Sequence, residues 1–243
     1  MQHKPKPIPT HNHTGWTSNQ LNEVSELFVD FCRRSAVHPV LDIGAAFGIA
    51  THAALSAGAT VIANDVDSAH LRILLENTPE ADRKRLVLVP GRFPRHLSFA
   101  EASLSAIHAS NVFHFLTGPQ LTNGAASIAH WLVVGGKVFI QASTPWQSVF
   151  ASFIEEFEAR RARGDEWPGW VENTHKRFDH PKISQIPQNI HLLDEETLAR
   201  LFTGAGLEVE RAWTYRRRDL AKGLQFDGRE CAGLIAVKTK MLE

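Results

Sequence analysis

The chain has 243 residues, and its 26 lysines and arginines balance its 26 aspartates and glutamates. This length fits one α/β domain with a sizeable core and some insertion, and the neutral balance gives no global basic field that would attract DNA. No apolar run approaches the roughly 20 residues that span a bilayer, and the start lacks the apolar core of a secretory signal, so we expect a cytoplasmic protein. Cys32 and Cys231 are the only cysteines, which argues against a disulfide framework or a cysteine-rich metal site.

The first part of the chain predicts an arm followed by a helix. Residues 1–15 are rich in proline, histidine and polar side chains, so we expect them to lie loosely on the surface. Thr17 or Ser18 can then cap a helix over about residues 19–34, whose apolar side chains recur on one face.

From residue 40 onward, short apolar runs alternate with helical patterns. Repeated β-α units imply a mostly parallel sheet with helices on both faces, and a ligand crevice at the carboxyl ends of the strands. The expected strands are 40–43, 60–64, 86–89, 106–109 and 138–142, and the expected helices between them are 49–56, 68–77 and 117–131.

The region after Pro145 breaks this rhythm. Aromatic side chains at helical spacing are followed by a charged run and by Trp-Pro-Gly-Trp, over a length that exceeds an ordinary connection. We interpret residues 145–190 as an insertion that covers the crevice and shapes a substrate pocket. Asp194 then caps a helix to about residue 203, and two strands follow, over 207–215 and 231–238. The expected organisation is a single domain over 1–243, with an N-terminal arm and helix (1–35), a cofactor-binding core (36–144), an inserted lid (145–190) and a C-terminal helix and strand pair (191–243).

The most informative stretch is residues 40–48, Val-Leu-Asp-Ile-Gly-Ala-Ala-Phe-Gly. It reads as a buried strand that opens into a loop between Gly44 and Gly48, where glycines let the backbone approach a ligand closely. The spacing is not the Gly-x-Gly-x-x-Gly of dinucleotide-binding folds, and the carboxylate of Asp42 would repel a pyrophosphate but suits a cationic ligand. Asp65 follows about 20 residues after the first glycine, where a ribose-binding acid belongs. The loop therefore predicts a site for a ribose and a positive charge, without phosphates.

This combination resembles the class I S-adenosylmethionine-dependent methyltransferases. Asp42, Gly44 and Gly48 match the first motif of that family, and Asp65 matches the acid that accepts hydrogen bonds from the ribose hydroxyls. Residues 110–116, Ser-Asn-Val-Phe-His-Phe-Leu, resemble the segment beside the transferable methyl, and residues 132–140 resemble the turn into the fifth strand. These matches follow the order of the family from residue 40 to about 142. The resemblance implies a Rossmann-like, doubly wound, seven-stranded, mostly parallel sheet.

The resemblance also implies the cofactor and the residues that hold it. The cofactor is S-adenosylmethionine, with S-adenosylhomocysteine as product and no metal. Where the family often has an acid that binds the adenine amino group, this chain has Arg92, which cannot accept a hydrogen bond, so we expect backbone groups around Phe93 to hold the adenine. The expected cofactor-binding residues are Asp42, Gly44, Ala45, Ala46, Phe47, Gly48, Asp65, Val66, Arg92, Phe93 and Asn111.

The acceptor is less constrained, because a sulfonium methyl is already electrophilic and no particular catalytic residue is obligatory. His114, beside the expected methyl position, is a candidate base or a structural histidine, and His191, near the return of the insertion, is a candidate base or an ordinary loop residue. Trp16 and Trp146 are candidate acceptor-binding residues or packing residues. Arg216–Arg218 indicates a phosphate patch or, more in keeping with the neutral total, a solvated strand end.

We therefore predict transfer of a methyl group to an oxygen, nitrogen or sulfur, less readily a carbon, of a small planar or aromatic metabolite. One alternative is a methyltransferase that acts on protein or RNA, and another is a cofactor-binding regulatory protein without catalysis. A nicotinamide dehydrogenase is disfavoured by Asp42 and the glycine spacing. The sequence leaves the acceptor, the methylated atom and the oligomeric state open.

Overall fold

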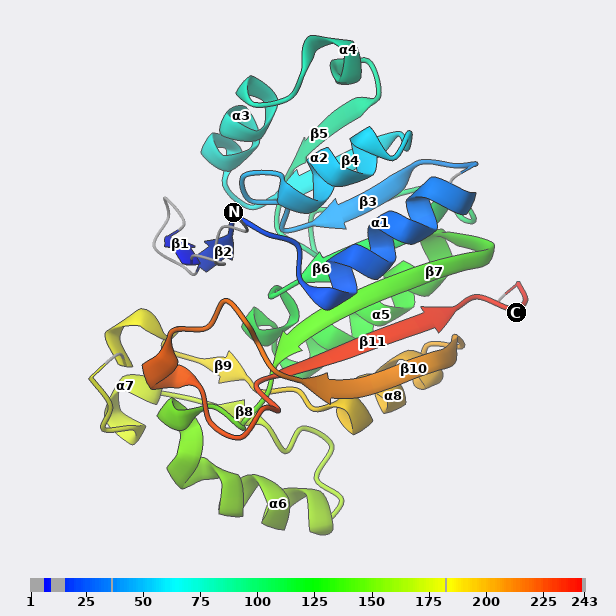
Figure 1. Ribbon diagram of the computed structural model, residues 1–243. Coiled ribbons are helices and arrows are strands. Elements are labelled where there is room, and N and C mark those ends of the chain that lie inside the picture. The colour runs from blue at the N-terminus through cyan, green and yellow to red at the C-terminus, as the bar shows by residue number, and fades with distance from the viewer. Residues whose placement is uncertain (1–6, 10–15, 36, 182, 242–243) are drawn as a thin grey trace.

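A seven-stranded sheet forms the centre of the computed structural model, which describes residues 7–9, 16–35, 37–181 and 183–241 (Figure 1). The strand order is β10-β11-β7-β6-β3-β4-β5. Neighbouring strands from β7 to β5 are parallel, whereas β11 runs antiparallel to both β7 and β10. This confirms the doubly wound, mostly parallel sheet. The strands are β3 (Val40–Ile43), β4 (Val61–Asp65), β5 (Leu86–Pro90), β6 (Leu104–Ser110), β7 (Leu132–Ser143), β10 (Glu208–Tyr215) and β11 (Cys231–Val237).

Helices cover both faces of the sheet (Figure 1). One face carries α1 (Glu23–Ser35), α2 (Ile49–Ser56) and α3 (Ser68–Glu76), and the other carries α5 (Gly118–Trp131) and α8 (Glu195–Gly204). Successive strand residues point to opposite faces, so β3, which is buried along its length, serves both layers. Val40 packs with α1 and α2, whereas Leu41 and Ile43 pack with α5 and α8. The short helix α4 (Glu80–Arg83) precedes β5 at the sheet edge.

The start of the first helix differs from the prediction. Helix α1 begins at Glu23, because the side chain of Asn22 caps it by accepting a hydrogen bond from the Ser25 amide at 2.9 Å. The predicted cap positions instead belong to strand β2 (Trp16–Ser18), which pairs antiparallel with β1 (Pro7–Pro9). The arm is therefore paired, not loose, at Pro7–Pro9. The rest of the arm, residues 1–6 and 10–15, lies outside the described residues.

The 145–190 region folds around its own aromatic core, beyond the carboxyl ends of the parallel strands (Figure 1). The predicted aromatic stripe forms this core, which also takes in Leu224 from the connection between β10 and β11. Two distant parts of the chain thus meet over the same edge of the sheet. The elements are η2 (Ser148–Phe153), α6 (Ile154–Ala162), β8 (Trp170–Val171), α7 (Thr174–Arg177), η3 (Ile183–Gln185), β9 (Ile190–His191) and η4 (Lys222–Leu224).

Asp194 caps α8 as predicted, accepting from the Thr197 amide at 2.9 Å. Cys32 and Cys231 are both buried free thiols. Within the described part of the chain, every helix falls short of the length or apolar character that crossing a membrane requires.

Candidate active site

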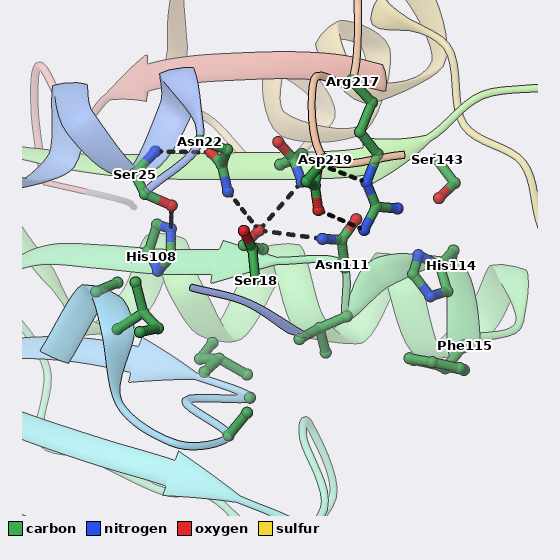
Figure 2. A pocket seen from close by; sticks show the side chains of 18 of the residues that line it. Ser18, Asn22, Ser25, His108, Asn111, His114, Phe115, Ser143, Arg217 and Asp219 are labelled. Carbon is green, nitrogen blue, oxygen red and sulfur yellow. Dashed lines mark hydrogen bonds and ion pairs between the residues drawn. The ribbon is translucent and has the colours of Figure 1, made fainter. Parts of the chain in front are cut away.

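A cavity of about 670 Å³ opens at the carboxyl ends of β3, β4 and β6. It lies where the strand order reverses, which is the ligand crevice of open α/β sheets, and its volume is typical of a small-molecule site. The loops after β3 and β4 line it, together with η1 (Phe113–Phe115) after β6, the start of α1 and residues 215–224. Figure 2 shows ten of its side chains labelled.

The glycine loop supplies backbone rather than side chains to the cavity. Gly44 has a φ of +71°, and a Cβ there would lie 2.4 Å from Cγ2 of Val112, so only glycine fits. Gly48, at φ +87°, lies at the start of α2 and packs closely on Leu74 of α3. Gly44, Ala45 and Ala46 line the cavity.

Two predicted cofactor residues of this loop are placed elsewhere. Gly48 and Phe47 are not among the described residues that line the cavity. The Phe47 ring instead packs edge-on against His70, with centroids 5.2 Å apart. Gly48 starts α2 and lets that helix approach α3. The sequence motif alone does not distinguish this structural role from direct contact with a ligand.

Both carboxylate oxygens of Asp42 are occupied within the protein. Thr51 donates its hydroxyl hydrogen to Oδ2 at 2.7 Å, and Oδ1 lies 2.8 Å from Nδ1 of His108. Nε2 of His108 lies 3.0 Å from the hydroxyl of Ser25, whose amide is capped by Asn22. Asp42 therefore puts negative charge at the cavity wall and ties the glycine loop to the start of α1.

This chain of hydrogen bonds continues across the sheet (Figure 2). The side-chain amides of Asn22 and Gln141 both donate to the hydroxyl of Ser110, at 2.9 and 3.2 Å. Tyr215, at the end of β10, donates its phenol hydrogen to Gln141. The wall opposite the glycine loop is thus one connected polar layer drawn from α1, β6, β7 and β10.

Asp65 lies at the carboxyl end of β4, where the ribose-binding acid was predicted. Its Oδ2 accepts from the Ala46 amide at 2.9 Å, and its Oδ1 accepts from the Asp67 amide at 2.9 Å and lies 3.1 Å from Nδ1 of His70. Each carboxylate oxygen offers two lone pairs, so Oδ2 keeps one for a ligand.

The residues predicted around an adenine lie at the neighbouring wall. Val66 is 54% exposed and lines the cavity, and Arg92 is exposed at its rim. The Phe93 ring is buried and stacks on Phe113 at a centroid distance of 5.9 Å. Because that ring belongs to the core, the backbone of Phe93 is what remains available to a ligand, as the sequence indicates.

His114 lies in the cavity wall, on η1 directly after β6. It is 8% exposed, and its Nδ1 has no hydrogen-bond partner among the described residues. Burial and, to a smaller extent, the nearby charge of Arg217 lower the pKa of His114 to about 3. The imidazole is therefore uncharged at neutral pH.

The structure places His191 and Trp146 away from the cavity. His191 is fully buried between the edges of Trp167 and Trp170, its Nδ1 lies 3.0 Å from the carbonyl of Leu116, and burial lowers its pKa to about 4. Trp146 is 2% exposed within the aromatic core. Neither residue is among the described residues that line the cavity, because the packing of the 145–190 region, which the sequence does not reveal, decides which aromatic groups face inward. Trp16 belongs to β2, and its side chain lies outside what the structure describes.

The sequence missed a part of the site carried by the connection between β10 and β11. Arg217 is not a solvated strand end: its side chain is 13% exposed, lines the cavity and is paired with Asp219 through Nε and Nη2 at 3.1 and 3.3 Å. Arg216 and Arg218 on either side are exposed. Exposed and largely buried side chains alternate across these three arginines, as they do in an extended segment, and this alternation turns the middle guanidinium inward.

Comparison with known proteins agrees with this geometry. Residues 40–136 match the family model described as a methyltransferase domain, and this stretch holds Gly44, Asp65 and Asn111. No curated protein matches the chain.

Solved structures share its fold at low sequence identity. The glycopeptide N-methyltransferase MtfA in complex with S-adenosylmethionine is 17% identical, with 88% of this chain and 86% of that chain covered and a TM-score of 0.58. A methyltransferase from Methanosarcina mazei is 14% identical over 92% of this chain and 100% of that chain, with a TM-score of 0.65. A methyltransferase in complex with the Haloferax volcanii Trm112 activator is 15% identical over 89% and 90%, with a TM-score of 0.59.

Residues 40–136 belong to the methyltransferase-domain family, and the chain as a whole shares the fold of S-adenosylmethionine-dependent methyltransferases. Its cavity fits the methyl donor of this class. Oδ1 of Asn111 is buried, has no hydrogen-bond partner in the described residues and can accept from the ammonium of the methionine part. The Asn111 backbone, at φ +58° and with its amide bonded to the Gln141 carbonyl at 2.9 Å, holds the side chain in place. In this methyltransferase Asp65 would take a ribose hydroxyl, and Gly44 would leave room for the chain of the amino acid.

Proposed function

We propose that this methyltransferase acts on a small, planar or aromatic metabolite, by in-line displacement at an oxygen, nitrogen or sulfur. The observation that carries the proposal is the shape of the cavity. One part, the cofactor half, is lined by residues from the stretches 42–46, 64–66 and 91–93 and by Asn111. The other part, the acceptor half, is lined by Ser110 and by residues from the stretches 22–25, 112–115, 141–150 and 215–224. A volume of about 670 Å³ accommodates a nucleoside-sized cofactor and a small acceptor together.

Apolar side chains from separate parts of the chain support a planar, apolar acceptor body. Phe150 from the 145–190 region, Leu220 and Leu224 all line the acceptor half, as does Phe115, which is 39% exposed. Aromatic and aliphatic side chains favour aromatic ligands, because ring faces and edges pack closely against them.

The chemistry asks the protein for position more than for reactive groups. S-adenosylmethionine, when bound, supplies an electrophilic methyl on a sulfonium. Asp65 and Asn111 would fix the two ends of the cofactor, and the acceptor half would hold the acceptor in line and exclude water. Such alignment supplies roughly 7 to 11 kcal/mol of barrier reduction in favourable systems.

We assign His114 to positioning the acceptor rather than to proton abstraction. A base is most effective when its pKa lies near the working pH, and burial lowers the pKa of His114 to about 3. The unpartnered Nδ1 of this neutral ring remains available for a hydrogen bond to the acceptor.

Labelled cofactor tests the size of the acceptor. Purified protein is incubated with methyl-labelled S-adenosylmethionine and size-fractionated extract from the source cells, with Asp65→Ala as the inactive control. We expect label to appear in the low-mass fraction with the wild type and to be lost with Asp65→Ala. Label found only in protein or RNA would overturn the small-molecule proposal and favour the macromolecular alternative. The fold relative MtfA, a glycopeptide N-methyltransferase, is a reason to measure these fractions.

A further inference from the structure

We propose that the acceptor is an oxygen acid, ionised at neutral pH, whose oxyanion is bound by Arg217 and receives the methyl group. This inference rests on the proposed methyl transfer and adds the chemical class of the acceptor. It comes from the 216–230 segment, which joins β10 to β11 and forms one wall of the acceptor half.

Arg217 presents a free guanidinium edge to the cavity. Asp219 occupies Nε and Nη2, whereas Nη1 makes no hydrogen bond within the described part of the chain. Figure 2 shows this nitrogen pointing away from Asp219, to the side on which Ser143 and His114 lie. Burial opposes the charge on Arg217, but the charge and hydrogen bonds of Asp219, together with Cys231 and Tyr215, outweigh it, and the pKa of Arg217 is raised. The group stays cationic and can bind an oxyanion through charge-assisted hydrogen bonds.

The protein holds this segment in place through a buried acid. Glu230 is 1% exposed, and its carboxylate accepts from the backbone amides of Arg217, Phe226 and Gly228 at 3.2, 2.9 and 2.9 Å. Three hydrogen bonds from backbone amides to this one carboxylate fix the backbone from which the guanidinium projects. Arg217 is thus pre-oriented before any ligand arrives, which lowers the entropic cost of binding.

The local charge favours an anion. Three arginines and one aspartate of residues 216–219 line the cavity, a net charge of two positives on this segment, whereas the acids Glu23, Glu26, Asp42 and Asp65 line the cavity from other segments. Arg216 and Arg218 are exposed at the rim and Arg217 lies inside. The positive potential of the rim arginines would attract an anionic acceptor, which would then bind the guanidinium of Arg217 inside the cavity.

The groups around Arg217 cannot remove a proton from a neutral acceptor. Burial raises the pKa of Cys231 to about 12 and raises that of Tyr215 well above its usual value, so both keep their protons. His114 has its pKa lowered to about 3, and the carboxylate of Asp219 is held by Arg217. An acceptor that arrives already ionised needs no base.

The transfer step then balances without proton movement. A lone pair of the oxyanion forms the new oxygen–carbon bond, the carbon–sulfur bond breaks, and its electron pair returns to sulfur. The negative charge of the acceptor and the positive charge of the sulfonium disappear together. The products are a neutral ester or ether and S-adenosylhomocysteine. The neutral oxygen no longer pairs with Arg217, which favours product release.

Binding of aryl acids and their amides tests the site. Benzoate, 2-naphthoate and the corresponding primary amides are titrated calorimetrically into the full-length protein, with and without S-adenosylhomocysteine. We expect each acid to bind at least tenfold more tightly than its amide. Arg217→Gln should reduce this preference to within twofold, and the exposed control Arg95→Gln should keep it.

Amides that bind as tightly as the acids in the wild type would overturn the proposal, and that comparison needs no variant to fold. A preference that survives in Arg217→Gln would overturn it as well. An acid preference in protein that fails to bind S-adenosylhomocysteine would instead contradict the proposed methyl transfer while leaving the oxyanion site standing, so the two failures are distinguishable.

The labelled product identifies the acid. Label that mild alkali releases as methanol indicates a methyl ester and hence a carboxylate acceptor, whereas label that resists alkali and resides in an aryl methyl ether indicates an acidic phenol. Both outcomes support the proposal. Label on nitrogen, sulfur or carbon would contradict it.

Discussion

The two halves of the cavity are built in different ways. The cofactor half uses residues at the ends of consecutive parallel strands, such as Gly44 after β3 and Asp65 at the end of β4, and the two loops are joined by a hydrogen bond from the Ala46 amide to Asp65. The acceptor half joins side chains that lie far apart in the chain, such as Asn22 with Ser110 and Tyr215 with Gln141. Local sequence is therefore enough to build a binding site for the cofactor, which is the same throughout the class. The site for the acceptor, which varies, depends on how distant segments of the chain fold over it.

The largest effect should come from the glycine loop. Gly44→Ala adds a Cβ 2.4 Å from Val112 at a φ of +71°, and left-handed strain plus overpacking should lower the free energy of unfolding by about 3 kcal/mol. Gly58→Ala is the matched control, because Gly58 also has a positive φ, +98°, but no neighbour within 4 Å. It should lose only about 1 kcal/mol in the same urea titration. Equal losses would show that the close approach to Val112 is not required.

Removal of the ribose acid should weaken cofactor binding next. Asp65→Ala deletes a ligand acceptor and frees the Ala46 and Asp67 amides, and we expect a loss of about 2 to 3 kcal/mol in S-adenosylhomocysteine binding, roughly 30- to 150-fold. Isothermal calorimetry measures it, with the exposed Asp30→Ala as control. Unchanged affinity in Asp65→Ala would remove Asp65 from the cofactor half.

Two buried histidines, one in the acceptor half and one behind it in the 145–190 region's packing, should give a pH dependence of stability. His114 and His191 have pKa values lowered by burial to about 3 and about 4, so the unfolded chain binds protons that the folded chain does not as pH falls below 6.5. The stabilisation is present above pH 6.5 and is lost as pH falls toward those values. Between pH 7 and pH 5 the loss should be about 2 kcal/mol for each histidine.

Chemical denaturation of His114→Leu and of the exposed control His38→Gln at both pH values measures this share. His114→Leu should reduce the pH dependence of the unfolding free energy by the contribution of one histidine, and His38→Gln should leave that pH dependence unchanged. An unaltered slope in His114→Leu would contradict the burial of that ring.

The smallest effect should come from the polar layer behind the acceptor. Tyr215→Phe removes the hydrogen bond to Gln141 and should cost about 1 kcal/mol of unfolding free energy while leaving S-adenosylhomocysteine affinity within twofold. Ser148→Ala, which loses an exposed hydrogen bond to the Gly223 carbonyl, is the control and should lose less. A large drop in cofactor affinity in Tyr215→Phe would show that the two halves are coupled.

The sequence predicted the sheet, and with it the strand ends that carry Gly44 and Asp65, because these depend on short-range patterns. The strand runs and the cap at Asp194 were readable locally, as was the carboxylate at residue 65. The acceptor half was not readable in this way. His191 and Arg217 are both polar residues near the expected crevice, yet tertiary packing buries the first between two tryptophans and turns the second into the cavity.

The start of α1 shows the same limit on a smaller scale. Three polar residues, Thr17, Ser18 and Asn22, are all acceptable helix caps. The choice of Asn22 lets Ser25 meet His108 across 83 residues of chain, and that contact is invisible to a local reading.

A crystal structure of the protein with S-adenosylhomocysteine tests the division of the cavity most directly. We predict the ribose at Asp65, the amino acid part between Gly44 and Asn111, and the sulfur facing the side of the cavity that holds His114 and Arg217. The ligand bound across Arg217 with its sulfur turned away from His114, or bound outside the cavity, would contradict the account.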